Sequence, residues 1–279
     1  MRGGRMSEPA VVFTIVAEDV QDLAEQASRL LLSLITEALK DRGDARVILS
    51  GGTTPRATYK LLASGISAQG IEIEKVSWFF GDERWVPHDD PQSNEGMALE
   101  TLLWPIGAPA HTVHSWHAGS GDPVECARRY DAVVKAAMGT ARTSPDILLL
   151  GIGPDGHTAS LFPGAVAHLP DGRQVLVAPD ICGSNTAPQG LSLPVAAAAV
   201  QGGAARGWRL TLCPDLLRTS RSVIFLAEGA DKTTALRRAR KGDPGTPAAW
   251  IRGRKTYFIA TRDAMGPEQP DYGRDIRNA

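Results

Sequence analysis

The segment GIGPDGHTASLFPG, residues 151–164, indicates the fold of this chain better than any other stretch. It follows an apolar run, DILLL at 146–150, which predicts a buried strand. Its three leading glycines predict a sharp loop in which the backbone approaches another group closely. A strand followed by a loop with Asp155 and His157 is typical of the carboxyl end of a strand in an α/β sheet, where such folds place active sites. A turn Asp and a surface His are also common in loops, so this segment alone leaves the structural interpretation open.

A second strand-like run, 45–49, precedes the small and flexible segment SGGTTP at 50–55. Pro55 suits the first turn of a helix, and a Ser or Thr before it suits the N-cap. Free amides and hydroxyls at a helix start can bind an anion, phosphate in particular. The segment lacks the Walker A pattern, and an ordinary strand-to-helix turn uses the same residue types.

A third apolar run, 76–80, ends where the charged residues Asp82, Glu83 and Arg84 begin. Such a cluster is most often a solvated loop. Because parallel topology brings the carboxyl ends of strands to one edge of a sheet, we expect these side chains to lie near the other two loops.

Strand-like and helix-like segments alternate along the chain. Apolar runs predict strands at 11–16, 45–49, 76–80, 146–150, 174–178, 223–227 and 255–260, and periodic patterns predict helices at 17–42, around Pro55, and at 93–103, 123–138 and 230–240. The alternation predicts an α/β fold of three layers, with a parallel-rich, Rossmann-like sheet and helices on both faces. No linker divides the chain, so we expect a single domain over residues 1–279, with 1–10 and 265–279 flexible.

The composition argues against several classes of protein. With a net charge of −1 and a pI near 6.6, we expect no nucleic-acid partner. The cysteines at 126, 182 and 213 are widely spaced, so we expect no disulfide framework and a cytoplasmic location. We find no metal-ligand spacing, no signal peptide and no apolar run of membrane-spanning length, and so expect neither a metal nor a membrane partner.

The three loop motifs together resemble the glucosamine-6-phosphate isomerase/6-phosphogluconolactonase superfamily, and within it the 6-phosphogluconolactonases of the pentose phosphate pathway. The matching stretches run in the family's order from about residue 11 to about residue 260: SGGTTP, FFGDERWVP with the later SN pair, GIGPDGHTASLFPG, RLTL at 209–212 and GADKTTAL at 229–236. DGHTASLFPG is the most specific of them, and the others are jointly strong.

The resemblance implies a carboxylic ester hydrolase that converts 6-phosphoglucono-1,5-lactone to 6-phosphogluconate, with no cofactor and a sugar-phosphate lactone as its partner. A monomer is compatible with the sequence. His157 is the expected general base, because an imidazole ordinarily titrates near neutrality, and Asp155 is expected to orient it. Arg84 is expected to stabilise the oxyanion or to contact the substrate. The residues expected to bind the phosphate and sugar are Ser50, Gly51, Gly52, Thr53, Thr54, Asp82, Arg84, Arg209 and Lys232. Asp82 is a lesser candidate, as are Glu83 and Asn94, and these three are expected either to contact sugar hydroxyls or to structure the loop.

Two regions depart from the family pattern. Residues 179–207 are longer and richer in alanine than expected, and are interpreted as a surface excursion with a short helix at 194–201, or alternatively as a lid over the substrate. The segment CPDLL at 213–217 replaces a family segment that usually contains Asn.

Two other functions compete with lactone hydrolysis. A glucosamine-6-phosphate deaminase/isomerase needs carboxylates besides the His, and its relatives carry a Glu in a segment resembling GHIAFNEP, where this chain has GHTASLFPG. They also tend to have DEY in place of the DER at 82–84. A non-catalytic sugar-phosphate sensor would keep the phosphate loop and lose the acid-base residues, and this chain keeps His157.

Overall fold

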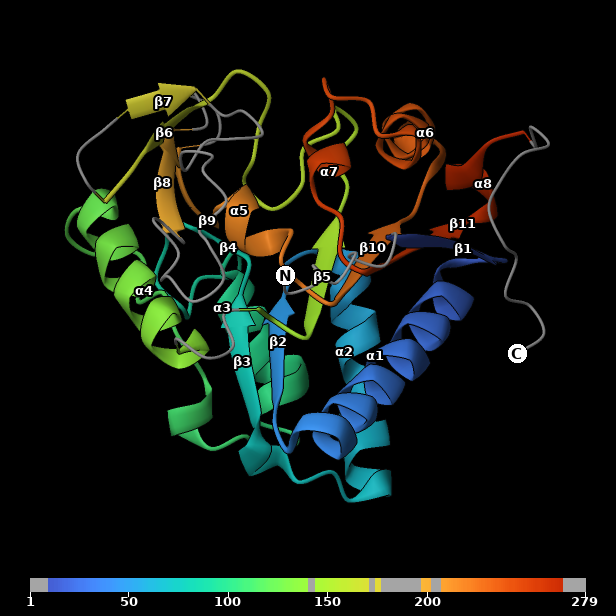
Figure 1. Ribbon diagram of the computed structural model, residues 1–279, viewed down its shortest axis with the longest axis horizontal. Coiled ribbons are helices and arrows are strands. Elements are labelled where there is room, and N and C mark those ends of the chain that lie inside the picture. The colour runs from blue at the N-terminus through green and yellow to red at the C-terminus, as the bar shows by residue number, and fades with distance from the viewer. Residues whose placement is uncertain (1–9, 140–143, 171–173, 177–196, 202–206, 268–279) are drawn as a thin grey trace, which may run out of the picture.

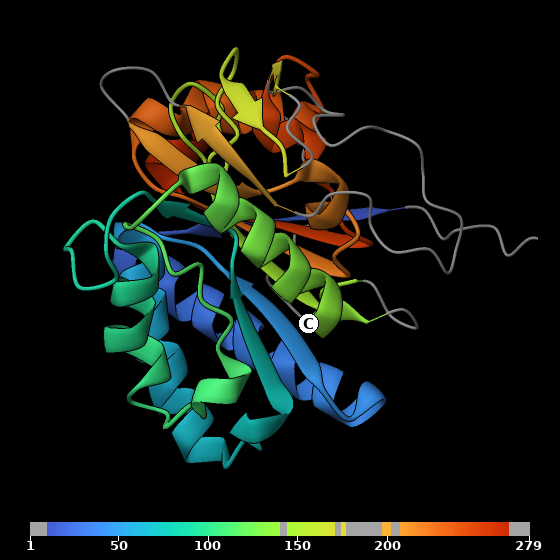
Figure 2. The ribbon, with the colours of Figure 1, turned by 90° about the vertical axis from the view of Figure 1, so that its left-hand side faces the viewer.

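A six-stranded parallel sheet forms the centre of the structure, a computed structural model that describes residues 10–139, 144–170, 174–176, 197–201 and 207–267. Its strands, in spatial order, are β1 (Val11–Ala17), β11 (Lys255–Thr261), β10 (Ser222–Ala227), β5 (Ile147–Gly151), β2 (Ala45–Leu49) and β3 (Val76–Phe80). Helices flank this sheet on both sides (Figures 1 and 2), so the α/β class with a parallel sheet and helices on both faces is confirmed.

A second, antiparallel sheet packs beside the first and was not predicted. Its strands, in spatial order, are β4 (Asp82–Arg84), β9 (Trp208–Leu212), β8 (Ala197–Gln201), β6 (Val166–His168) and β7 (Gln174–Leu176). Gly81 joins the two sheets, because its N–H donates to the carbonyl of Leu49 in β2 and its carbonyl accepts from the N–H of Leu212 in β9.

The helices fill the space around the sheets. The α-helices are α1 (Val20–Arg42), α2 (Thr53–Gln69), α3 (Asn94–Ala98), α4 (Pro123–Met138), α5 (Pro214–Leu217), α6 (Thr233–Lys241), α7 (Pro247–Trp250) and α8 (Arg262–Met265). Shorter turns are the 3₁₀ segments η1 (Ile73–Lys75), η3 (Ala110–Thr112) and η4 (Ala230–Lys232) and the π-helical η2 (Leu99–Leu103). Helices α1 and α2 pack against each other below the large sheet in Figure 1, and α4 packs against β8 and β9 of the small one. None of the helices in the described ranges has the length and apolar character needed to cross a bilayer.

Local sequence signals explain most element boundaries. Strand β5 is apolar at four successive positions because both of its faces are buried, as expected of a central parallel strand. Helix α1 begins where the Asp19 side chain accepts the N–H of Asp22 and ends at Gly43, which adopts the left-handed conformation expected of a C′ glycine. The helix expected at 123–138 has those same bounds.

The expectation of a helix at 194–201 is wrong for its described part. Ala197 to Gln201 form strand β8, which is paired with β9 on one side and β6 on the other. Alanine is a strong helix former, and tertiary packing overrides that preference, because Ala197 to Val200 are fully buried where α4 packs against β8. The proposed excursion or lid at 179–196 and 202–206 lies outside the described residues.

The cysteines differ from expectation at one position. Cys126 is free and buried, whereas Cys213, directly after β9, is disulfide-bonded. We expected no disulfide framework from the wide cysteine spacing, and the bonded state of Cys213 departs from that expectation.

At the amino ends of strands β5 and β10, a buried carboxylate contacts several elements. Asp146, about 1% exposed, lies 2.9 Å from Arg42 Nε at the end of α1 and 3.6 Å from Arg221 Nε before β10. Its other oxygen accepts the N–H of Arg46 in β2 at 2.9 Å.

We predict that Asp146→Ala lowers the free energy of unfolding by roughly 2 to 3 kcal/mol, because it removes a buried negative charge beside two guanidinium groups and the acceptor of the Arg46 N–H. Asp41→Ala is the matched control, since Asp41 is half-exposed and lies 3.8 Å from Arg42. Urea unfolding of both variants tests this. Equal losses for the two variants would contradict the role given to Asp146.

Candidate active site

The candidate site lies at the point where the order of the parallel strands reverses. The chain passes outward from β2 to β3, returns to β5 on the other side of β2, and continues to β10 and β11. Strands β2 and β5 are paired only at Val47–Ile147 and Ile48–Leu148, whereas β2 and β3 are paired along five positions. The carboxyl ends of β2 and β5 therefore separate and open a crevice, which is where α/β folds bind ligands.

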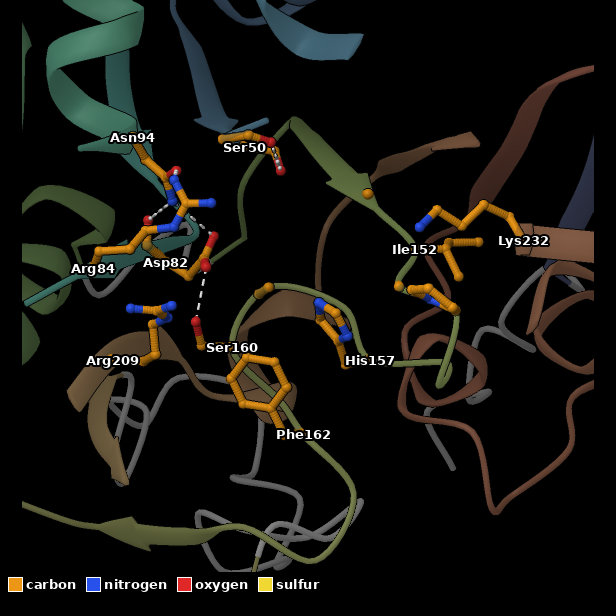
Figure 3. A pocket seen from close by; sticks show the side chains of 15 residues that line it. Ser50, Asp82, Arg84, Asn94, Ile152, His157, Ser160, Phe162, Arg209 and Lys232 are labelled. Atoms are coloured by element: carbon orange, nitrogen blue, oxygen red, sulfur yellow. Dashed lines mark hydrogen bonds between the residues drawn. The ribbon is translucent and has the colours of Figure 1, made fainter. Parts of the chain in front are cut away.

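A cavity of about 360 Å³ occupies this crevice (Figure 3). Its lining comes from the loops that follow β2 and β5, from strands β4 and β9, from the start of α3 and from η4. The lining residues are Ser50, Gly51, Asp82, Arg84, Asn94, Gly151, Ile152, Gly153, Pro154, His157, Ala159, Ser160, Phe162, Arg209 and Lys232. The expectation that separate strand ends converge on one site is borne out by this geometry.

His157 is fixed by its own loop. The ring nitrogen Nδ1 of His157 lies 2.5 Å from Asp155 Oδ1, and the backbone N–H of His157 donates to the same oxygen at 3.1 Å. The ring of Phe162 packs against the imidazole, with centroids 4.7 Å apart. Since Nδ1 is bound to Asp155, Nε2 is the nitrogen available to a molecule in the cavity.

Gly153 makes this arrangement possible. A Cβ at Gly153 would lie 2.0 Å from both Nδ1 and Cε1 of His157 and 2.8 Å from Asp155 Oδ1. The imidazole and carboxylate thus lie directly on the glycine backbone, and a side chain here would displace them. The close approach inferred from the glycines is made by the His–Asp pair of the loop itself.

The SGGTTP loop is anchored at its first residue by a tyrosine. The Ser50 N–H donates to the Tyr59 hydroxyl at 2.9 Å, and that hydroxyl donates to the Ser50 carbonyl at 2.7 Å. The N-cap expectation is wrong: helix α2 begins at Thr53 with Gly52 as N-cap, and no side chain caps it. Its first turn holds no acidic residue of its own, and the Thr53 hydroxyl donates to Glu228 Oε1 at 3.3 Å. The backbone N–H groups of an uncapped helix start favour an anion.

The wall after β3 is a network of buried polar groups. Asn94 Oδ1 accepts from Arg84 Nη1 at 2.5 Å, and Asn94 Nδ2 donates to the Asp82 carbonyl at 2.9 Å. Asp82 Oδ2 accepts from Ser160 Oγ at 2.8 Å, which joins this wall to the loop after β5.

Glu83 lies behind the wall rather than in the cavity. It is about 1% exposed and accepts four hydrogen bonds, from the N–H groups of Arg84, Asn94 and Glu95 and from the Ser93 hydroxyl. Burial raises the pKa of the Glu83 carboxyl to about 7, and the four donors act in the opposite direction. Of the two roles considered for Glu83, the structure supports structuring of the loop.

The cationic residues of the cavity form two groups. Arg84 in β4 and Arg209 in β9 are directly paired across the antiparallel ladder, although like charges at such positions repel. Lys232, in η4 after β10, lies on the far side of the cavity, with His157 between the two groups (Figure 3). Two cationic walls facing one space suit an anionic ligand.

A side cavity of about 300 Å³ adjoins the first and shares Arg84, Asn94 and Arg209 with it. Gly52, Thr53 and Arg56 line this second space. Of the predicted site residues, Asp155 and Thr54 line neither cavity: Asp155 contacts His157, and Thr54 lies in the first turn of α2. Within the described ranges, no three His, Cys, Asp or Glu side chains gather closely enough to hold a metal ion.

Several residues that line the cavity were not predicted from the sequence. Ile152, Ala159, Ser160 and Phe162 belong to the quoted GIGPDGHTASLFPG segment, yet nothing in their residue types marks them as cavity residues. Ala159 has a positive φ of 47°, an uncommon backbone conformation for a residue with a side chain.

The chain is similar in sequence and in structure to known proteins. The family model described as glucosamine-6-phosphate isomerases/6-phosphogluconolactonase matches residues 18–259. A protein of Mycobacterium tuberculosis (strain ATCC 25618 / H37Rv) named 6-phosphogluconolactonase is 33% identical over 255 residues, which cover 88% of this chain and 94% of the relative. The structure of 6-phosphogluconolactonase from Trypanosoma cruzi superposes with a TM-score of 0.73 at 27% identity, covering 93% of this chain and 97% of that one. A monomeric glucosamine-6-phosphate deaminase superposes with a TM-score of 0.67 at 20% identity, covering 91% and 98%, and thus shares the fold.

We predict that Glu83 makes the stability of the protein fall as the pH rises from about 4.5 to about 7. Its folded-state pKa is raised from 4.5 to about 7, so in this window the unfolded chain loses the proton while the folded chain keeps it. The full loss is on the order of 3 kcal/mol and is complete above pH 7. Urea unfolding between pH 4 and 8 should show this component in the wild type and not in Glu83→Gln. If the free energy of unfolding of the wild type rises with pH relative to that of Glu83→Gln, the prediction is wrong.

Proposed function

The chain belongs to the glucosamine-6-phosphate isomerase/6-phosphogluconolactonase family, and we propose that it hydrolyses 6-phosphoglucono-1,5-lactone to 6-phosphogluconate. Relatives that bear the name 6-phosphogluconolactonase over most of this chain support this activity. The observation that carries it is the His157–Asp155 pair in a cavity with cationic residues on both sides. That arrangement joins a proton acceptor to a binding site for an anionic substrate.

In the proposed reaction, His157 Nε2 accepts a proton from water as the water oxygen attacks the lactone carbonyl carbon. Asp155 accepts the Nδ1–H of the imidazole, which fixes the tautomer and stabilises the cation that forms. The tetrahedral intermediate then collapses, the bond to the ring oxygen breaks, and His157 returns its proton to that oxygen. Arg84 supplies positive charge for the carbonyl oxygen as it becomes negative. No covalent intermediate is required, because a lactone is an activated ester.

We propose that the phosphate is anchored by the Ser50–Thr54 loop together with basic side chains of the cavity. The uncapped start of α2 supplies backbone amides, and Arg209 and Lys232 supply charge. Asp82 is left for the sugar hydroxyls. Binding energy at a remote phosphate can fix the position of the lactone carbon relative to His157.

The deaminase alternative is less well supported, although a deaminase shares the fold. Isomerisation moves a proton between carbon atoms and needs carboxylates besides the His. At the place where the deaminase segment carries an acid, this chain has Leu161, which is fully buried, and Phe162, which packs against His157. No structural observation favours a non-catalytic sensor. The cytoplasmic location, the monomeric state and the single domain stay predictions.

We predict that His157→Asn lowers kcat about a hundredfold or more, because the general base is removed. Gly153→Ala should also lower kcat, since the added methyl group would occupy the place of the imidazole. The measurement couples fresh 6-phosphogluconolactone to an NADP-dependent 6-phosphogluconate dehydrogenase, with the spontaneous hydrolysis subtracted. His111→Asn, at an exposed position outside the cavity, is the control. Near-normal turnover by a folded His157→Asn protein would refute the assignment, and ammonia release from glucosamine 6-phosphate would favour the deaminase.

We predict that turnover depends strongly on the substrate phosphate. Unphosphorylated gluconolactone should lose several orders of magnitude in kcat/KM, because its ring is no longer fixed relative to the base. Lys232→Ala should mainly raise KM for the phosphorylated lactone, about tenfold or more, whereas Arg237→Ala, at an exposed position in α6, should leave it unchanged. Comparable kcat/KM values for the two lactones would show that the Ser50–Thr54 loop is only a turn.

A further inference from the structure

Asn94 occupies a central place in the site that the proposed function leaves without a role. It is about 2% exposed and its side-chain amide is fully engaged. Oδ1 accepts from Arg84 Nη1 at 2.5 Å, while Nδ2 donates to the carbonyl of Asp82 at 2.9 Å and to its Oδ1 at 3.3 Å. One side chain thus holds two residues of β4 that face the cavity (Figure 3).

Asn94 also lies directly on the loop after β2. A Cβ at Gly51 would lie 1.6 Å from Asn94 Oδ1 and 2.1 Å from its Cγ. The glycine is therefore required by the Asn94 amide, independently of any ligand. Contact with Gly51 on one side and Arg84 on the other makes Asn94 the physical link between the Ser50–Thr54 loop and the guanidinium group.

Glu83 fixes the backbone of Asn94. Its Oε1 accepts the N–H groups of Arg84 at 2.7 Å and Asn94 at 2.8 Å, and its Oε2 accepts the N–H of Glu95 at 2.8 Å. The carboxylate therefore ties the end of β4 to the start of α3. With backbone and side chain both held, the position of Asn94 Oδ1 is set before any ligand binds.

We propose that Asn94 is a positioning residue that fixes the Arg84 guanidinium relative to the Ser50–Thr54 loop and acts on the reaction through Arg84. The inference rests on the proposed function. A neutral amide suits this task better than a carboxylate does. The two acceptors of Arg84 Nη1 are the uncharged oxygens of Asn94 and Gln92, so the guanidinium is held while its charge stays available to an anion.

A double-mutant cycle on kcat/KM for 6-phosphogluconolactone tests the inference. Asn94→Ala should lose ten- to a hundredfold in the wild-type background and at most about threefold in an Arg84→Ala background, because the residue that Asn94 positions is then absent. Asn94→Asp should also lose activity, mainly through a higher KM, since a carboxylate would neutralise Arg84. Equal losses from Asn94→Ala in the two backgrounds, or no loss in the first, would overturn the proposal.

Thr101→Val separates positioning from support of the fold. Thr101 is buried in η2, shortly after α3, and its hydroxyl donates to the Met97 carbonyl at 2.7 Å. This variant should lower the melting temperature and leave kcat and KM unchanged. If Thr101→Val and Asn94→Ala lose kcat/KM in the same proportion to their loss of melting temperature, the effect at Asn94 is structural and the proposal fails.

Crystal structures of the wild type and Asn94→Ala give a readout that needs no activity. Arg84 should leave its wild-type position in the variant, and an unmoved guanidinium would overturn the proposal. A wild type without lactonase activity but with a displaced Arg84 in the variant would refute the proposed function alone.

Discussion

The short pairing between β2 and β5 is the constraint on which the site depends. If these strands were paired to their ends, as β2 and β3 are, the loops after Leu49 and Gly151 would begin side by side. Because the chain leaves β2 toward one edge of the sheet and β5 toward the other, the two loops separate instead. Gly81 then lets the chain leave β3 for the small sheet, which brings Arg84 and Arg209 to the open side. The arrangement of the cavity thus follows from strand order before any side chain is considered.

The acidic residues beside Arg84 are arranged so that they do not neutralise its guanidinium group. Glu83 is saturated by four donors behind the wall, and Asp82 is bonded to Ser160 and Asn94. Arg84 meanwhile is held by neutral oxygens. Placing two arginines opposite each other on a ladder costs stability, and an anionic ligand would offset that cost on binding.

The sequence predicted the parts of the structure that local signals determine. Apolar runs located the central strands, and glycines and polar residues after them located the loops of the site. The small sheet was missed because its strands are short and take their stability from distant partners, most clearly at Ala197 to Val200. The importance of Asn94 was likewise underestimated, since its contacts with Gly51 and Arg84 exist only after residues far apart in sequence have been brought together.

The side chains around His157 limit the chemistry that this protein can perform. Asp155 occupies Nδ1, Phe162 packs against the ring and Gly153 lies beneath it, so proton exchange is confined to Nε2. One such nitrogen is sufficient for ester hydrolysis, because the proton taken from water is returned to the departing ring oxygen. Transfer of a proton between two carbon atoms, followed by loss of ammonia, needs carboxylates besides the His. Where the deaminase segment carries an acid, this chain has the buried Leu161 and Phe162, of which Phe162 packs against the imidazole. A deaminase shares this fold, and under the proposed function a few side chains at the end of β5 distinguish the two reactions.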